Sequence, residues 1–123
     1  MTYIVLPVDF SETTDKLING AVKFAKQIDG KIGLIHVTPS DIGFAIGDMG
    51  FQYFPEVEQQ EIKEELLQLN NLEESIKLQG VACEHLLKQG SAKEIILEFA
   101  AEKNASYIVM GSHGRSGIYV WEV

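Results

Sequence analysis

The sequence predicts an α/β domain with a parallel sheet and helices on both faces of that sheet. Short apolar runs rich in β-forming residues alternate with longer segments of helical periodicity, in the order β-α-β-α-β-α-β. Glycine, proline and asparagine punctuate the boundaries. The length of 123 residues suits a single domain, residues 1–123, with a core of its own.

The first strand and helix follow from residue type. Residues 3–8 are an apolar run that should loosen near Pro7, because proline cannot donate a hydrogen bond within a sheet. Ser11 is a suitable N-cap for the helix that follows. Apolar residues then recur at helical spacing until Asp29-Gly30, which is expected to end the helix with a suitable C-terminal glycine.

The second strand, residues 32–37, leads into the longest irregular segment. His36 is interpreted as a structural residue of this strand that faces a helix or the sheet edge. Residues 38–55 alternate glycines with aromatic and aliphatic side chains. Two interpretations of the segment remain open, a flap buried against the sheet or a partner, and a lid over a ligand.

The second half begins with a long helix over residues 56–79. One face of it is apolar, and the other carries seven glutamates against two lysines, which is typical of a solvated surface rather than a metal site. Gly80 ends this helix. Residues 81–88 form a strand with Cys83 and His85 on one face, and two such ligands are too few for a metal site.

The last expected strand, residues 106–110, ends at a glycine-rich turn. A capping box, Ser91-Ala92-Lys93-Glu94, opens the helix before it. Small residues in the turn, 111–117, let backbone N–H groups approach an anion. Parallel sheets bind ligands at the carboxyl ends of strands where the strand order reverses. If the first and fourth strands are neighbours, residues 9–11 and this turn meet in one crevice.

Composition and missing motifs exclude several classes of function. The net charge of −8 argues against a nucleic acid or an anionic membrane as partner. Cys83 is the only cysteine, no apolar run approaches the roughly 20 residues of a membrane helix, and no signal peptide is evident, so we expect a soluble, cytoplasmic protein. Neither a P-loop nor a dinucleotide fingerprint is present. No catalytic triad or carboxylate pair is evident either, which leaves at most a slow ATPase.

The chain resembles the universal stress protein family from its first strand onward. The residues that carry the resemblance are Ile4-Val5-Leu6-Pro7-Val8-Asp9-Phe10-Ser11, Leu34-Ile35-His36-Val37, Gly90-Ser91-Ala92-Lys93-Glu94-Ile95-Ile96 and Ile108-Val109-Met110-Gly111-Ser112-His113-Gly114-Arg115-Ser116-Gly117. The resemblance implies a Rossmann-like domain with strand order 3-2-1-4-5 that is usually dimeric. One branch of the family binds ATP or related adenine nucleotides.

The same resemblance implies a nucleotide site. Asp9 would lie beside the adenine or ribose, and backbone groups near Val37 would contact the adenine. Gly111 and Gly114 match the first two glycines of the family's G-x2-G-x9-G-[ST] phosphate motif, and Arg115 would offset phosphate charge. The implied nucleotide-binding residues are Pro7, Asp9, Ser11, Val37, Met110, Gly111, Ser112, His113, Gly114 and Arg115.

The sequence departs from the family pattern after Gly114. The third glycine would fall just beyond Val123, so we expect a domain truncated at its C-terminus, with strand order 3-2-1-4 and with the family's fifth strand and last helix missing. The site should then bind ATP or AMP weakly, with Mg²⁺ only alongside ATP.

The expected exposed edge of the fourth strand predicts a homodimer or an exchanged assembly. The alternative function is a stress-response dimer that binds no nucleotide and acts as an interaction module.

Overall fold

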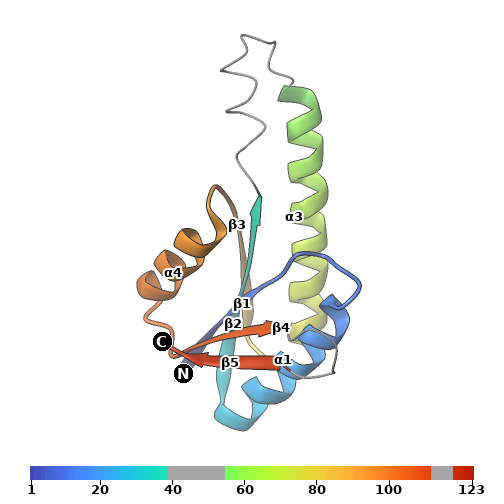
Figure 1. Cartoon of the computed structure of the whole chain (residues 1–123). Helices are drawn as coiled ribbons and strands as arrows, with labels where there is room; N and C mark the ends of the chain where they lie inside the picture. Colours follow the sequence, from blue (N-terminus) through green and yellow to red (C-terminus); the bar gives the residue numbers. More distant parts are fainter. Residues whose placement is uncertain (39–54, 112–117) are drawn as a thin grey trace.

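The computed structural model describes residues 1–38, 55–111 and 118–123 (Figure 1). In chain order, its elements are β1 (Thr2–Pro7), α1 (Thr14–Ile28), β2 (Gly30–Thr38), α3 (Pro55–Leu78), β3 (Cys83–Gln89), α4 (Ala92–Glu102), β4 (Tyr107–Gly111) and β5 (Ile118–Glu122). The strands form one sheet with the order β3-β2-β1-β4-β5. The α/β class and the expected order of the first four strands are confirmed.

The fifth strand differs from the expectation. The position beside β4, expected to be an open edge, is occupied by β5, which runs antiparallel to β4 with Tyr107 opposite Glu122 and Gly111 opposite Ile118. The sheet is therefore mixed rather than fully parallel, and its outer edge at this end belongs to β5. The physical reason is that Ile118–Glu122 is rich in β-branched and aromatic residues, which favour pairing with an available strand edge.

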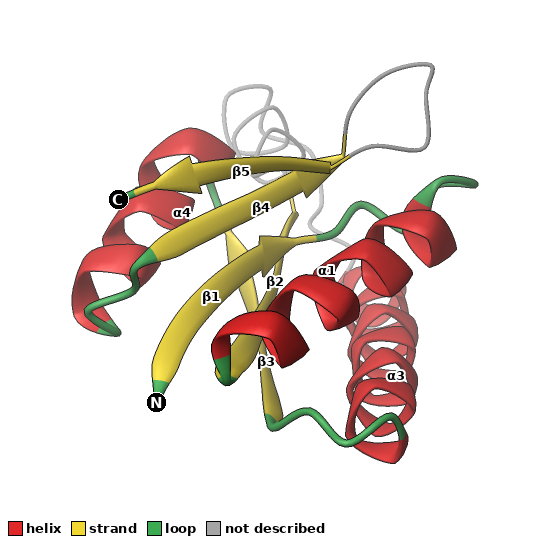
Figure 2. Ribbon diagram, turned by 90° about the horizontal axis from the view of Figure 1, so that it is seen from below, coloured by secondary structure: helices red, strands yellow, loops and turns green. Residues whose placement is uncertain are grey.

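Two helical layers enclose the sheet. Figure 2 shows α1 and α3 on one face and α4 on the other. Side chains of β1 alternate between these layers, because Ile4 and Leu6 pack in the larger cluster with α1 and α3, whereas Val5 packs in the smaller cluster with Phe99 of α4. Burial on both sides explains why β1 reads as a continuous apolar run.

Helix α1 begins two residues later than an N-cap at Ser11 would place it. Thr13 occupies the N-cap position without a side-chain capping bond, so the prediction of Ser11 as N-cap is wrong. The Ser11 N–H instead donates to Asp9 Oδ1 at 3.0 Å. A short polar side chain offers the backbone this alternative to a helical turn, which delays the helix.

The other end of α1 also differs in detail. Asp29, rather than Gly30, has the left-handed conformation that caps the helix, with φ of 53°. Gly30 begins β2, where a β-carbon would lie 2.7 Å from Ile4 Cδ1. Gly80 closes α3 with φ of +90°, as expected. Ser91 is the N-cap residue of α4, although its side chain makes no capping bond.

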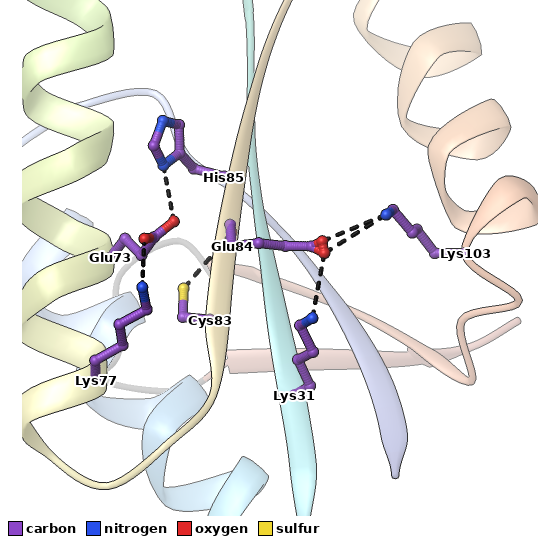
Figure 3. Close-up of polar contacts among 7 residues, drawn as sticks. All are labelled: Lys31, Glu73, Lys77, Cys83, Glu84, His85 and Lys103. Atoms are coloured by element: carbon purple, nitrogen blue, oxygen red, sulfur yellow. Dashed lines mark hydrogen bonds and ion pairs between the residues drawn. The ribbon is translucent and has the colours of Figure 1, made fainter.

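Helix α3 is joined to the sheet by polar as well as apolar contacts. Leu69 and Ile76 are fully buried, and Leu72 packs beside them. Figure 3 shows Glu73 accepting hydrogen bonds from Lys77 Nζ and from His85 Nδ1 of β3, each at 2.8 Å. Cys83 and His85 share the α3 face of β3, as their spacing predicted.

The ionic contacts of β3 lie on both faces of the sheet. On the opposite face of β3, Glu84 pairs with Lys31 at 3.4 Å and with Lys103 at 3.3 Å (Figure 3). The Cys83 thiol is buried, and burial, followed by the charge of Glu73, raises its pKa to about 12. Cys83 is therefore a packing residue and not a nucleophile at neutral pH.

Candidate functional site

The carboxyl ends of β1 and β4 lie side by side at the point where the strand order reverses. The two strands pair in parallel, with Ile4 opposite Tyr107 and Val5 opposite Ile108, and Figure 2 shows them running in the same direction. The expectation that these strands are neighbours is confirmed. In parallel sheets, ligands bind at the carboxyl ends of strands at such a point of reversal.

Asp9 is the best-defined polar group at this edge. It follows β1 directly, is exposed, and accepts the N–H of Ser11. Hydrogen bonds from Ser11 are the main cause that holds the pKa of Asp9 below its ordinary value, and His36 adds a smaller effect. Asp9 is therefore an anion at neutral pH. A carboxylate has about four acceptor positions, so it retains capacity for hydroxyl or amino donors of a ligand.

A strained residue follows Asp9. Phe10 has a φ of 60°. Residues other than glycine adopt this left-handed backbone conformation rarely, at a cost of about 1–3 kcal/mol. Its ring packs on the His36 imidazole with a centroid distance of 4.5 Å. Sequence reasoning placed Phe10 in the loop of residues 9–11 but not among the implied nucleotide-binding residues. It did not predict the left-handed conformation, because no glycine or asparagine marks that position.

His36 ties this turn to the sheet and to α3. Its Nδ1 donates to the Val8 carbonyl at 2.7 Å, and its Nε2 lies 3.5 Å from Glu65 Oε2. The Thr38 hydroxyl donates to the same Glu65 oxygen at 2.7 Å. The interpretation of His36 as a strand histidine that faces a helix is confirmed. His36 also supports the backbone next to Asp9. This role could not be predicted from the sequence, because it depends on contacts between residues far apart in the chain.

The structure places six of the ten implied nucleotide-binding residues. Pro7 is half-buried at the end of β1, Val37 is half-buried near the end of β2, and Met110 and Gly111 are exposed at the end of β4. Among the described residues, apart from Gly111 itself and its chain neighbours, no atom lies within 4 Å of a β-carbon built on Gly111. Asp9 and Ser11 complete the set at the same edge of the sheet.

The remaining four implied residues lie outside the described part of the chain. They are Ser112, His113, Gly114 and Arg115. Residues 39–54, interpreted as a flap or a lid, also lie outside it. Within the described ranges, no group of three or more histidine, cysteine, aspartate or glutamate side chains is placed to hold a metal ion. No helix in those ranges is long and apolar enough to cross a membrane.

Comparison with known proteins agrees with this architecture. A universal stress protein of Bacillus subtilis is 30% identical over 120 residues, which cover 94% of this chain and 81% of that protein. A crystal structure from the universal stress protein family of Burkholderia pseudomallei superimposes with a TM-score of 0.73 at 23% identity, over 91% of this chain and 82% of that one.

A second solved structure contains a bound nucleotide. It is the universal stress protein from Archaeoglobus fulgidus in complex with dAMP, with a TM-score of 0.66 at 21% identity, covering 88% of this chain and 78% of that one. At this identity the likeness shows the fold alone. The model of the universal stress protein family matches residues 1–119. This match spans nearly the whole sequence, and the chain belongs to the universal stress protein family.

Proposed function

We propose that this chain is a regulatory domain that binds an adenine nucleotide, ATP or AMP, weakly at the carboxyl ends of β1, β2 and β4. The observation that carries the proposal is the Asp9 carboxylate, kept ionised by Ser11 and mounted where the strand order reverses. The dAMP complex of the Archaeoglobus relative supports an adenine nucleotide as the ligand class.

The charges at this edge suggest how such a ligand would be oriented. The Asp9 anion accepts hydrogen bonds from ribose hydroxyls or from the adenine amino group, and it repels phosphates. The phosphates would therefore extend toward Gly111 at the end of β4, where a missing side chain permits close approach to the backbone. Arg115 would supply the positive charge, and Mg²⁺ would accompany ATP only.

Calorimetry with adenosine, AMP and ATP tests the proposal. Asp9→Asn should weaken all three ligands by a factor of about 10 or more, since a charge-assisted hydrogen bond contributes about 1.5–3 kcal/mol. Asp29→Asn is the matched control, because Asp29 is exposed at the far end of α1 and its left-handed conformation suits asparagine. It should leave binding unchanged.

A second variant separates the two halves of the site. Gly114→Val should weaken ATP and AMP but not adenosine, because only the phosphates need close approach to that turn. Wild-type protein that releases no heat with any of the three ligands would refute nucleotide binding. Equal binding by wild type and Asp9→Asn would refute the assigned position of the ligand.

A second candidate function is an interaction module of a stress-response dimer in the cytoplasm. The observation that favours it is the exposure of large apolar side chains on β5. The free, buried thiol of Cys83 suits a reducing compartment. Proximity labelling in cells, with cytoplasmic proteins as the expected products, tests the location.

A further inference from the structure

Both ring nitrogens of His36 face oxygen acceptors. Nδ1 lies 2.7 Å from the Val8 carbonyl oxygen, and Nε2 lies 3.5 Å from Glu65 Oε2. A neutral imidazole carries one N–H and one lone pair, so either neutral tautomer would direct a lone pair at an oxygen. Only the imidazolium, with a proton on each nitrogen, makes both contacts attractive. The geometry therefore fits a positively charged His36.

The groups around His36 also favour a positive charge. Two carboxylates face it in the described part of the chain, Glu65 from α3 and Asp9 from the turn after β1. The Thr38 hydroxyl of β2 donates to the same Glu65 oxygen, and the residue opposite His36 on β3 is the apolar Leu87. The His36 side chain is 14% exposed, so burial opposes a charge but also reduces the screening of these attractions.

His36 contacts the chain on both sides of Asp9. The Val8 carbonyl, which accepts from Nδ1, belongs to the residue before Asp9, and the Val8 N–H donates to the Ile35 carbonyl at 2.9 Å. The ring of Phe10, the residue after Asp9, packs on the imidazole with a centroid distance of 4.5 Å, within reach of a cation–π attraction. The left-handed backbone of Phe10 persists only where such contacts support it. The position of the Asp9 carboxylate therefore depends on His36.

We propose that His36 is a positioning residue for Asp9 and acts as an imidazolium, so that uptake of one proton by His36 strengthens the binding of an adenine nucleotide. This inference rests on the proposed function, because Asp9 is the group that would contact the ligand. Loss of the Nε2 proton leaves a lone pair directed at Glu65, which repels the ring and weakens its contacts with Val8 and Phe10. The proton is exchanged with solvent. By linkage, binding of the ligand must in turn favour proton uptake.

The affinity for adenosine as a function of pH tests this proposal. Adenosine is chosen because it lacks the phosphate, which itself titrates near about pH 6. The dissociation constant, measured by calorimetry, should increase at least about fivefold as pH rises from about 5 to 8, the range in which histidine changes its charge. Asp9 contributes little to this change, because its pKa is held below its ordinary value.

Glu65→Gln distinguishes the proton from the mere presence of the ring. A glutamine amide N–H donates to the lone pair of a neutral His36, and the Thr38 hydroxyl can accept from the same amide, so the contact no longer needs a proton. This variant should retain the wild-type affinity of the acid limit throughout the range. His36→Asn keeps an N–H donor for Val8 but takes up no proton, so it should bind adenosine as weakly at the acid limit as the wild type does at the alkaline limit. A purely structural role of His36 predicts no gain for Glu65→Gln at the alkaline limit, and Glu65→Gln decides the question even if His36→Asn fails to fold.

His85→Asn is the matched control. His85 also contacts a glutamate of α3 through Nδ1, at 2.8 Å, but that glutamate is Glu73 and not Glu65. This variant should keep the wild-type pH dependence of adenosine binding.

Proton uptake provides a second measurement on the unmodified protein. Calorimetry in two buffers of different ionisation enthalpy, at the midpoint of the pH dependence, should show that the wild type takes up a fraction of a proton per adenosine bound and that Glu65→Gln takes up none. Adenosine binding that is independent of pH, a Glu65→Gln variant that loses affinity as the wild type does, or loss of the pH dependence in His85→Asn would overturn the role of His36 and leave the proposed function standing. The absence of adenosine binding at every pH would overturn both.

Discussion

Replacement of Glu73 by glutamine tests how α3 is held on the sheet. The Glu73 side chain is only 12% exposed and accepts hydrogen bonds from both His85 and Lys77. Glutamine keeps one acceptor oxygen but loses the charge and directs an N–H₂ group at one of two donors. Because Lys77 is about half exposed and its bond is screened, we count the His85 bond alone. We expect Glu73→Gln to lower the free energy of unfolding by about 1–2 kcal/mol.

Urea unfolding, followed by circular dichroism at pH 7, measures this loss. Glu74→Gln is the matched control, because Glu74 is the exposed neighbour and the change in net charge is the same. It should change the free energy of unfolding by less than about 0.5 kcal/mol. Equal effects of the two substitutions would refute a specific role for Glu73.

The pH dependence of the same difference has a definite sign. Burial alone would raise the pKa of Glu73, but hydrogen bonds from Lys77 and His85 outweigh burial and hold it below its ordinary value of 4.5. A carboxyl whose pKa is lowered by folding stabilises the protein above its unfolded pKa and loses that effect as pH falls through the folded pKa. The gap between wild type and Glu73→Gln should therefore be full at pH 6 and shrink below about pH 4.5. A gap that grew as pH fell below about pH 4.5 would contradict the assigned direction of the pKa shift.

Two further predictions concern the core. Gly33→Ala should destabilise the protein by about 1–3 kcal/mol, since the added methyl group would overlap the Tyr3 hydroxyl oxygen and lie 2.6 Å from Tyr3 Cζ. The urea midpoint measures this, and the same change in a Tyr3→Ala background should cost less; equal losses in both backgrounds would refute the contact. Because burial raises the pKa of Cys83 to about 12, the native thiol should react with an aromatic disulfide reagent at pH 8 at least about a hundredfold more slowly than in unfolded protein. Similar rates would show that Cys83 is accessible.

Local patterns were sufficient to predict most of the sheet and its helices. The period of apolar residues identified four strands and three helices, and Gly80 marks the end of α3 in the structure as in the sequence. β5 was not predicted, because its place and its antiparallel direction depend on the free edge of β4 rather than on local sequence. Ser11 and Gly30 were assigned the wrong roles at the ends of α1. The Ser11 N–H donates to the Asp9 side chain, and Asp29 rather than Gly30 has the left-handed conformation that ends the helix.

The candidate site was also predicted only in part. Asp9 and Gly111 were identified from the resemblance, and the parallel pairing of β1 with β4 was expected from topology. The supporting contacts of His36 with Val8 and Glu65 join residues 28 and 29 positions apart, and no local spacing reveals them. The left-handed Phe10 also escaped prediction, because the surrounding contacts impose that conformation on a residue that does not favour it.

The two histidine–glutamate contacts fix the position of α3 along its own axis. Apolar packing is not directional, so a helix held by leucines alone is free to slide by a fraction of a turn at little cost. Glu65 and Glu73 are eight residues apart, about 12 Å along a helix, and each contacts a histidine on a different strand, His36 on β2 and His85 on β3. Sliding would lengthen both contacts together. The two contacts thus set how far the first turns of α3 extend past the sheet.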